Sequence, residues 1–115
     1  MADLEVFKKD SENYTIIIKE NGVGVDITGY TFIMSIKEDI DDTDAEVKVR
    51  KEVTSHSDPT NGTTVIELTS TDTDQTVSSS TQKYVYDIVM VDTEDKPITL
   101  LSGNFKIKQR VTIST

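Results

Sequence analysis

The chain has 115 residues, with 12 basic and 21 acidic side chains, a formal net charge of -9 and no cysteine. The length suits a single domain, residues 1–115, with a core of its own, and the negative charge argues against binding to nucleic acid or to an anionic membrane surface. Without cysteine, disulfide bonds and thiolate metal sites are excluded.

The N-terminal segment supplies the first predicted strand. Its start lacks the basic and apolar stretches of a signal peptide, and no apolar run is long enough for a membrane span, so we expect neither. Residues 4–7 predict a short strand, followed by a polar turn at 8–11. This strand carries the apolar side chains Leu4, Val6 and Phe7. It can pair with a strand of its own domain or add to the sheet edge of a neighbouring molecule. We take these three as candidate partner-contact residues, with an edge strand packed on its own domain as the alternative.

The middle of the chain predicts further short strands. Twelve Val, twelve Ile and seventeen Thr favour strands over helices, because branching at Cβ restricts χ1 in helices. The positions with strand-like alternation are 14–19, 30–36, 47–53 and 63–68. Asn21-Gly22 indicates a tight hairpin, and residues 58–62 indicate a second turn. Asp26 and Thr28 are suited to cap local amides in the turn before the 30–36 strand.

One stretch, residues 69–77, lacks alternation. The hydroxyl residues at 69–71 can serve as N-caps, and Asp72 and Asp74 would then lie in the first turn of a helix. We therefore predict one short helical turn here, followed by a solvated loop.

Residues 83–115 predict two long strands joined by a polar loop at 92–97. Apolar Phe105, Ile107, Val111 and Ile113 fall on one face of the second strand, and cationic Lys106, Lys108 and Arg110 fall on the other. Such a strand is typical of an antiparallel sheet covered on one side only. About seven or eight short strands with regular turns predict an all-β sandwich or barrel. Gly29 and Gly103, placed at expected strand entries, would allow a bulge or a close backbone approach.

No segment predicts catalysis. The acidic residues 38–46 offer carboxylates to a hard cation, but an EF-hand loop starting at Asp39 would need Gly and Glu where the chain has Asp44 and Arg50. We expect a solvated loop there, with weak calcium binding as the alternative. His56 has no nucleophile motif around it, and we expect a surface histidine. The chain is therefore expected to be no enzyme, with no catalytic residue, cofactor or metal site.

A series of landmarks follows the chain: the strand 4–7 with Lys9-Asp10-Ser11, then Val25-Asp26-Ile27-Thr28-Gly29-Tyr30, residues 62–69 with Asp72, residues 84–88, and residues 100–107. In this order they resemble a family of small immunoglobulin-like domains of tailed bacteriophages, including the N-terminal domain of phage baseplate upper proteins. Lys9 departs from the Gly-Asp-Ser/Thr turn that relatives often have. The resemblance implies an immunoglobulin-like antiparallel sandwich, in which Tyr84 or Tyr86 would be the tyrosine corner.

The resemblance also implies a function. We expect a non-enzymatic virion structural protein, a tail or baseplate adaptor or a head-surface decoration subunit, made in the host cytoplasm. Its partners would be other virion proteins in many copies, with self-association as a further possibility. The alternative is a carbohydrate- or cell-surface-binding module. Such a module needs exposed aromatic residues, whereas Tyr30, Phe32, Tyr84 and Phe105 fall on expected inward positions.

Overall fold

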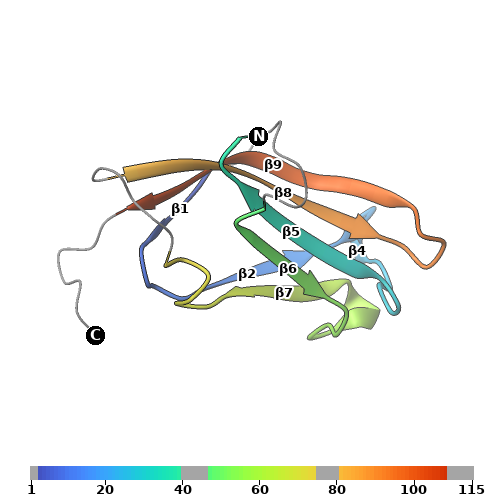
Figure 1. Ribbon diagram of the computed structural model, residues 1–115. Coiled ribbons are helices and arrows are strands. Elements are labelled where there is room, and N and C mark those ends of the chain that lie inside the picture. The colour runs from blue at the N-terminus through green and yellow to red at the C-terminus, as the bar shows by residue number, and fades with distance from the viewer. Residues whose placement is uncertain (1–2, 40–46, 75–80, 109–115) are drawn as a thin grey trace.

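The computed structural model describes residues 3–39, 47–74 and 81–108, and the regular secondary structure of this part is all strand apart from one short 3-10 helix (Figure 1). The all-β prediction is confirmed. The elements in chain order are β1 (Leu4–Phe7), β2 (Glu12–Ile17), β3 (Lys19–Glu20), β4 (Val23–Gly24), β5 (Thr31–Lys37), β6 (Val49–Val53), the 3-10 helix η2 (Pro59–Asn61), β7 (Thr63–Leu68), β8 (Thr81–Val91) and β9 (Pro97–Lys108).

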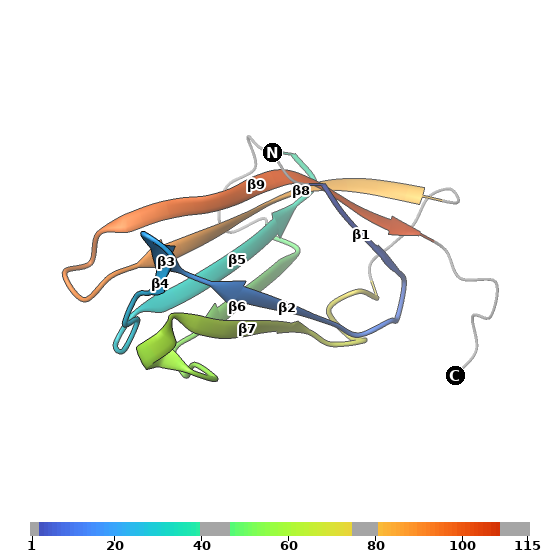
Figure 2. The ribbon, with the colours of Figure 1, turned by 180° about the vertical axis from the view of Figure 1, so that it is seen from behind.

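The strands form one large sheet and two small ones. The large sheet has the order β1-β9-β8-β5-β6, while β2 pairs with β7 and β3 pairs with β4. Figures 1 and 2 show β2 and β7 as a separate layer facing part of the large sheet. All pairs are antiparallel except β1 with β9, whose parallel register runs from Leu4↔Phe105 to Phe7↔Lys108. The expectation of a purely antiparallel sheet is therefore wrong at this one pair. Parallel strands need a long connection, and here most of the chain lies between them.

The core lies between the two layers. Paired residues of antiparallel strands point to the same face, so the alternation of β5 and β8 directs matched sets of side chains inward. The phenol of Tyr86 and the ring of Phe105 meet edge to face, with centroids 6.2 Å apart. The buried apolar residues are Val6, Ile27, Phe32, Met34, Ile36, Val49, Ile66, Leu68, Tyr84, Tyr86, Ile88, Met90, Phe105 and Ile107.

The turns follow the chemistry of their residues. Asn21 and Gly22 have φ of 52° and 81°, which suits the two-residue hairpin between β3 and β4. The expected turn at 58–62 contains the helix η2, and Gly62 ends it with φ of 77°. A Cβ at Gly62 would lie 2.3 Å from the carbonyl oxygen of Ile18, so glycine is required by space as well as by conformation.

The predicted helical turn at 69–77 is described as far as residue 74. Residues 70–73 form a turn, and the Thr73 N–H donates to the Thr69 carbonyl at 3.2 Å, one α-helical hydrogen bond. Thr69 acts as the expected cap: its hydroxyl oxygen accepts from the Asp72 N–H at 3.2 Å, and the Asp72 carboxylate accepts from the Thr69 N–H at 2.8 Å. This is a reciprocal capping box that closes a single turn. Residues 75–77 lie outside the described part.

The β8–β9 hairpin is longer than the rest of the sheet. Its register slips between Ile88, which faces Leu101, and Val89, which faces Thr99, so Leu100 is the extra residue of a β-bulge. Gly103 lies within β9 opposite Tyr86, and its expected place at a strand entry is wrong because β9 begins six residues earlier, at Pro97. The predicted positions of Arg110, Val111 and Ile113 lie outside the described residues.

Candidate assembly surfaces

Strand β1 carries the three candidate partner-contact residues, and the structure pairs it with its own domain. Val6 is buried in the core, Leu4 is partly buried against it, and Phe7 is 47% exposed. The Lys8 N–H donates to the Lys108 carbonyl at 2.8 Å, and the Lys108 ammonium lies 5.9 Å from the Phe7 ring centroid. This arrangement is the edge strand that the sequence left as the alternative. Only Phe7 offers a partner its side chain without a loss of core contacts.

The turn after β1 holds a strained residue. Lys9 has φ of 70°, in the left-handed region that favours glycine. The backbone of this turn is therefore in a conformation that glycine adopts more readily than lysine. The Asp10 N–H donates to the Phe7 carbonyl at 3.1 Å and closes this turn.

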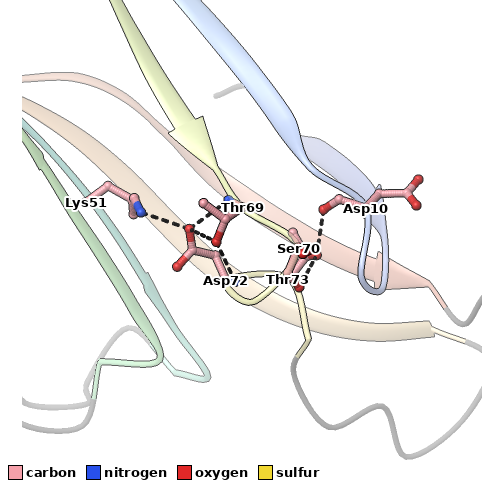
Figure 3. A network of polar contacts seen from close by, with 6 residues as sticks. All are labelled: Asp10, Lys51, Thr69, Ser70, Asp72 and Thr73. Carbon is pink, nitrogen blue, oxygen red and sulfur yellow. Dashed lines mark hydrogen bonds and ion pairs between the residues drawn. The ribbon is translucent and has the colours of Figure 1, made fainter. Parts of the chain in front are cut away.

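A polar network fastens the same turn to both layers (Figure 3). The Thr73 hydroxyl donates to the Asp10 carbonyl at 2.7 Å, and the Lys51 ammonium of β6 donates to the Asp72 carboxylate at 2.9 Å. Burial opposes ionisation of the Asp72 carboxyl, but hydrogen bonds from Thr69 and the Lys51 ammonium outweigh it and lower the pKa of Asp72. The network joins β6, the turn after β7 and the β1–β2 turn, and so connects the loop that follows β1 to both layers.

The first half of β9 forms an open edge. Strand β1 pairs only with Phe105 to Lys108, and no described strand pairs with the outer side of residues 97–103. Ile98 and Leu101 are 50% and 42% exposed although they pair with core-facing residues of β8. The β2–β7 layer does not extend beneath the end of this hairpin, as both ribbon views show. A shallow depression of about 170 Å³ lies along Thr99 to Ser102.

The outer face of the large sheet has a second open depression, of about 280 Å³. Its lining includes Ile33 and Val89 beside the charged Arg50 and Asp87. Both depressions are open to solvent, unlike the deep apolar clefts that enclose small ligands. They are better suited to a contact with a protein surface.

His56, which we expected as a surface histidine, is partly buried, and both of its ring nitrogens have a polar partner. Its Nε2 lies 2.8 Å from the Tyr30 carbonyl, and its Nδ1 lies 2.8 Å from the hydroxyl of the fully buried Thr64. Its ring also meets Phe32 edge to face at 5.4 Å. The local sequence around His56 is polar and gave no sign of these contacts, because the hydrogen-bond partners lie 8 and 26 residues away in the sequence. The ring is a structural link between β7 and the start of β5.

The described residues offer no metal centre. In the segments 3–39, 47–74 and 81–108, no three His, Asp or Glu side chains converge on one point. At the start of the acidic segment, Glu38 lies 3.7 Å from Lys48 in an exposed ion pair. The rest of that segment, residues 40–46, lies outside the described part, and with it Asp44 of the failed EF-hand pattern. Among the helices that the structure describes, none has the length and apolar character to cross a membrane.

In comparisons with known proteins, no family model matches the chain and no curated protein matches it significantly.

Proposed function

We propose that this chain is a non-enzymatic structural protein of a bacteriophage particle that acts by protein–protein assembly, as a tail or baseplate adaptor or as a head-surface decoration subunit. The observation that carries the assembly role is the pair of strand edges at β1 and β9, where Phe7, Ile98 and Leu101 are exposed. Unpaired strand edges with apolar side chains are sites where another chain can add. The virion location rests on the sequence landmarks.

The strand order supports the resemblance behind this proposal. In immunoglobulin folds, strands C, F and G form one sheet, with C′ added beside C in variable-type domains, and B pairs with E in the other. Here β6, β5, β8 and β9 follow the order C′, C, F and G, and β2 with β7 corresponds to B with E. The landmark at residues 25–30 is the turn before β5, in which the Asp26 carboxylate accepts from the Thr28 N–H at 3.0 Å.

The surface-binding alternative has less support. A carbohydrate site of this kind usually presents several exposed aromatic rings, which stack on sugars. Among the described aromatic residues, only Phe7 is exposed, while Phe32, Tyr84, Tyr86 and Phe105 are buried.

The test has two stages. Mass spectrometry of purified particles asks whether the protein is a virion component; its absence from particles of the phage or prophage that encodes it contradicts the proposal. Particle incorporation of Phe7→Ser is then compared with that of Ile17→Ser, a matched loss of an exposed apolar side chain on β2. We expect incorporation to fall about tenfold for Phe7→Ser alone, as for a residue central to an interface. Equal incorporation of both variants would show that β1 makes no partner contact.

A further inference from the structure

The edge of β9 between Pro97 and Gly103 combines two properties that soluble proteins rarely combine: unpaired backbone groups and exposed apolar side chains. Alternate backbone N–H and C=O groups of an edge strand point away from its neighbour, and here no described strand receives them. In addition, Ile98 and Leu101 expose about half of their side-chain surface beside this edge. Soluble proteins usually protect such an edge with charges or cover it.

The strand residues of this edge are uncharged, which distinguishes it from the others, and the Asp3 carboxylate accepts from the Asn104 N–H at 3.2 Å just beyond it. Residues 97–105 contain no Asp, Glu, Lys or Arg, although 29% of the chain is charged. The other edges of the large sheet and both edges of the β2–β7 sheet carry charge, at Glu5 in β1, Arg50 in β6, Glu12 in β2 and Glu67 in β7.

The contrast between the uncharged edge of β9 and the acidic rest of the chain indicates which molecule binds at this edge. Two copies of a chain with a net charge of -9 repel each other over most of their surfaces. The uncharged edge is a place where they can approach with little local repulsion, whereas a cationic partner would be drawn to the acidic surfaces instead. An edge strand is also self-complementary, because two antiparallel copies exchange equivalent backbone hydrogen bonds about a two-fold axis.

We propose that a second copy of this chain pairs with the edge of β9 at residues 97–103 and joins the two large sheets into one. Strand β1 limits the pairing, because it already occupies β9 from Phe105 onward. The available edge spans roughly 23 Å at about 3.3 Å per residue. The depression along Thr99 to Ser102 includes the bulge at Leu100, and a side chain of the second copy can insert there. This pairing is independent of whether the protein belongs to a virion.

The dimer should be weak and should tighten with salt. Pairing along one short edge buries less than the roughly 1,600 Å² of a standard interface, so we expect a dissociation constant of about 1 µM to 1 mM. Because the two copies carry like charge, screening lowers their repulsion, and raising NaCl from about 0.05 M to about 0.5 M should lower the dissociation constant. A contact made by opposite charges would weaken instead.

Sedimentation velocity over a range of concentrations tests this, with Thr99→Glu as the variant and Thr15→Glu as the control. Both threonines are exposed on strands, and both changes add the same charge, but only Thr99 lies on the open edge. We expect Thr99→Glu to raise the dissociation constant at least about tenfold, because two like charges meet across the axis, and Thr15→Glu to leave it within about twofold. Circular dichroism and thermal melting establish that both variants fold.

Three results would overturn the proposal. One is a wild-type chain that remains monomeric at about 1 mM. Another is a dimer that both glutamate variants weaken equally or that salt weakens. The third is a dimer that Thr99→Glu leaves intact and deletion of residues 1–8 abolishes, which assigns the contact to β1. Hydrogen exchange gives an independent readout: amides of residues 97–103 should gain protection as the concentration rises.

Discussion

The hydroxyl of Thr64 lies 2.8 Å from Nδ1 of His56, and Thr64 has no exposed surface. The other ring nitrogen, Nε2, faces the Tyr30 carbonyl, which can only accept, so Nε2 carries a proton. In the neutral ring, Nδ1 then accepts from Thr64. One side chain thus satisfies a buried hydroxyl on β7 and the backbone carbonyl of the residue just before β5.

The change His56→Ala should lower the free energy of unfolding by about 2 to 4 kcal/mol, because it leaves these two groups without a partner and removes the ring contact with Phe32. Urea denaturation measures the loss. Ser57→Ala is the control, since the Ser57 hydroxyl makes only an exposed 3.5 Å contact with the Thr63 carbonyl. A loss for His56→Ala as small as that of the control would mean that water replaces the ring.

Asp72→Asn should destabilise the fold by about 1 to 3 kcal/mol, because the amide weakens both the capping box and the contact with Lys51. The pKa of Asp72 is lowered in the folded state, so its contribution is present above the usual carboxyl pKa and is lost as the pH falls through the lowered value. Below about pH 4, the free energy of unfolding should therefore decrease less steeply with falling pH in this variant than in the wild type. Asp74→Asn is the control, because Asp74 makes only a 3.7 Å ion pair with Lys8. Equal effects of the two changes would contradict a special role for Asp72.

Lys9→Gly should raise the free energy of unfolding by about 0.5 to 1 kcal/mol. The left-handed conformation costs a lysine roughly 1 to 2 kcal/mol, part of which is offset by the greater freedom of glycine in the unfolded chain. Equilibrium unfolding compares this variant with Lys8→Gly, at the neighbouring position, which is not among the residues with positive φ and should lose stability. Destabilisation by Lys9→Gly would show that contacts of the lysine side chain outweigh its backbone strain.

Stability should fall between pH 10 and 12. Burial, with smaller contributions from Glu12 and Tyr86, raises the pKa of Tyr14 to about 12. Above the ordinary tyrosine pKa the unfolded chain loses this proton while the folded chain keeps it, so the free energy of unfolding decreases as the pH rises. Tyr14 is only half-buried, and the effect should be on the order of 1 kcal/mol. The variant Tyr14→Phe, followed by urea denaturation across this range, should show a smaller decrease; an unchanged decrease would assign it to Tyr84 and Tyr86, whose pKa values burial also raises.

The strands were predictable because their signal is local. Alternation along 30–36 and 83–91 identified the inward side chains of β5 and β8, and Asn21-Gly22 identified a hairpin from two residues. What the sequence did not indicate depends on contacts between distant residues. The partners of His56, the parallel pairing of β1 and the bulge at Leu100 are set by how the layers meet. The open edge of β9 was missed for the same reason, since it exists only because β1 stops at Leu4↔Phe105.

The parallel pair β1–β9 limits when the large sheet can form while the chain is being synthesised. Leu4 leaves the ribosome about a hundred residues before its partner Phe105, so β1 has no partner strand until β9 has been made. Because β9 also lies between β1 and β8, the large sheet cannot be completed from either side before that moment. A nascent chain that ends before β9 has an unpaired β8 edge, which is a site where another chain can add.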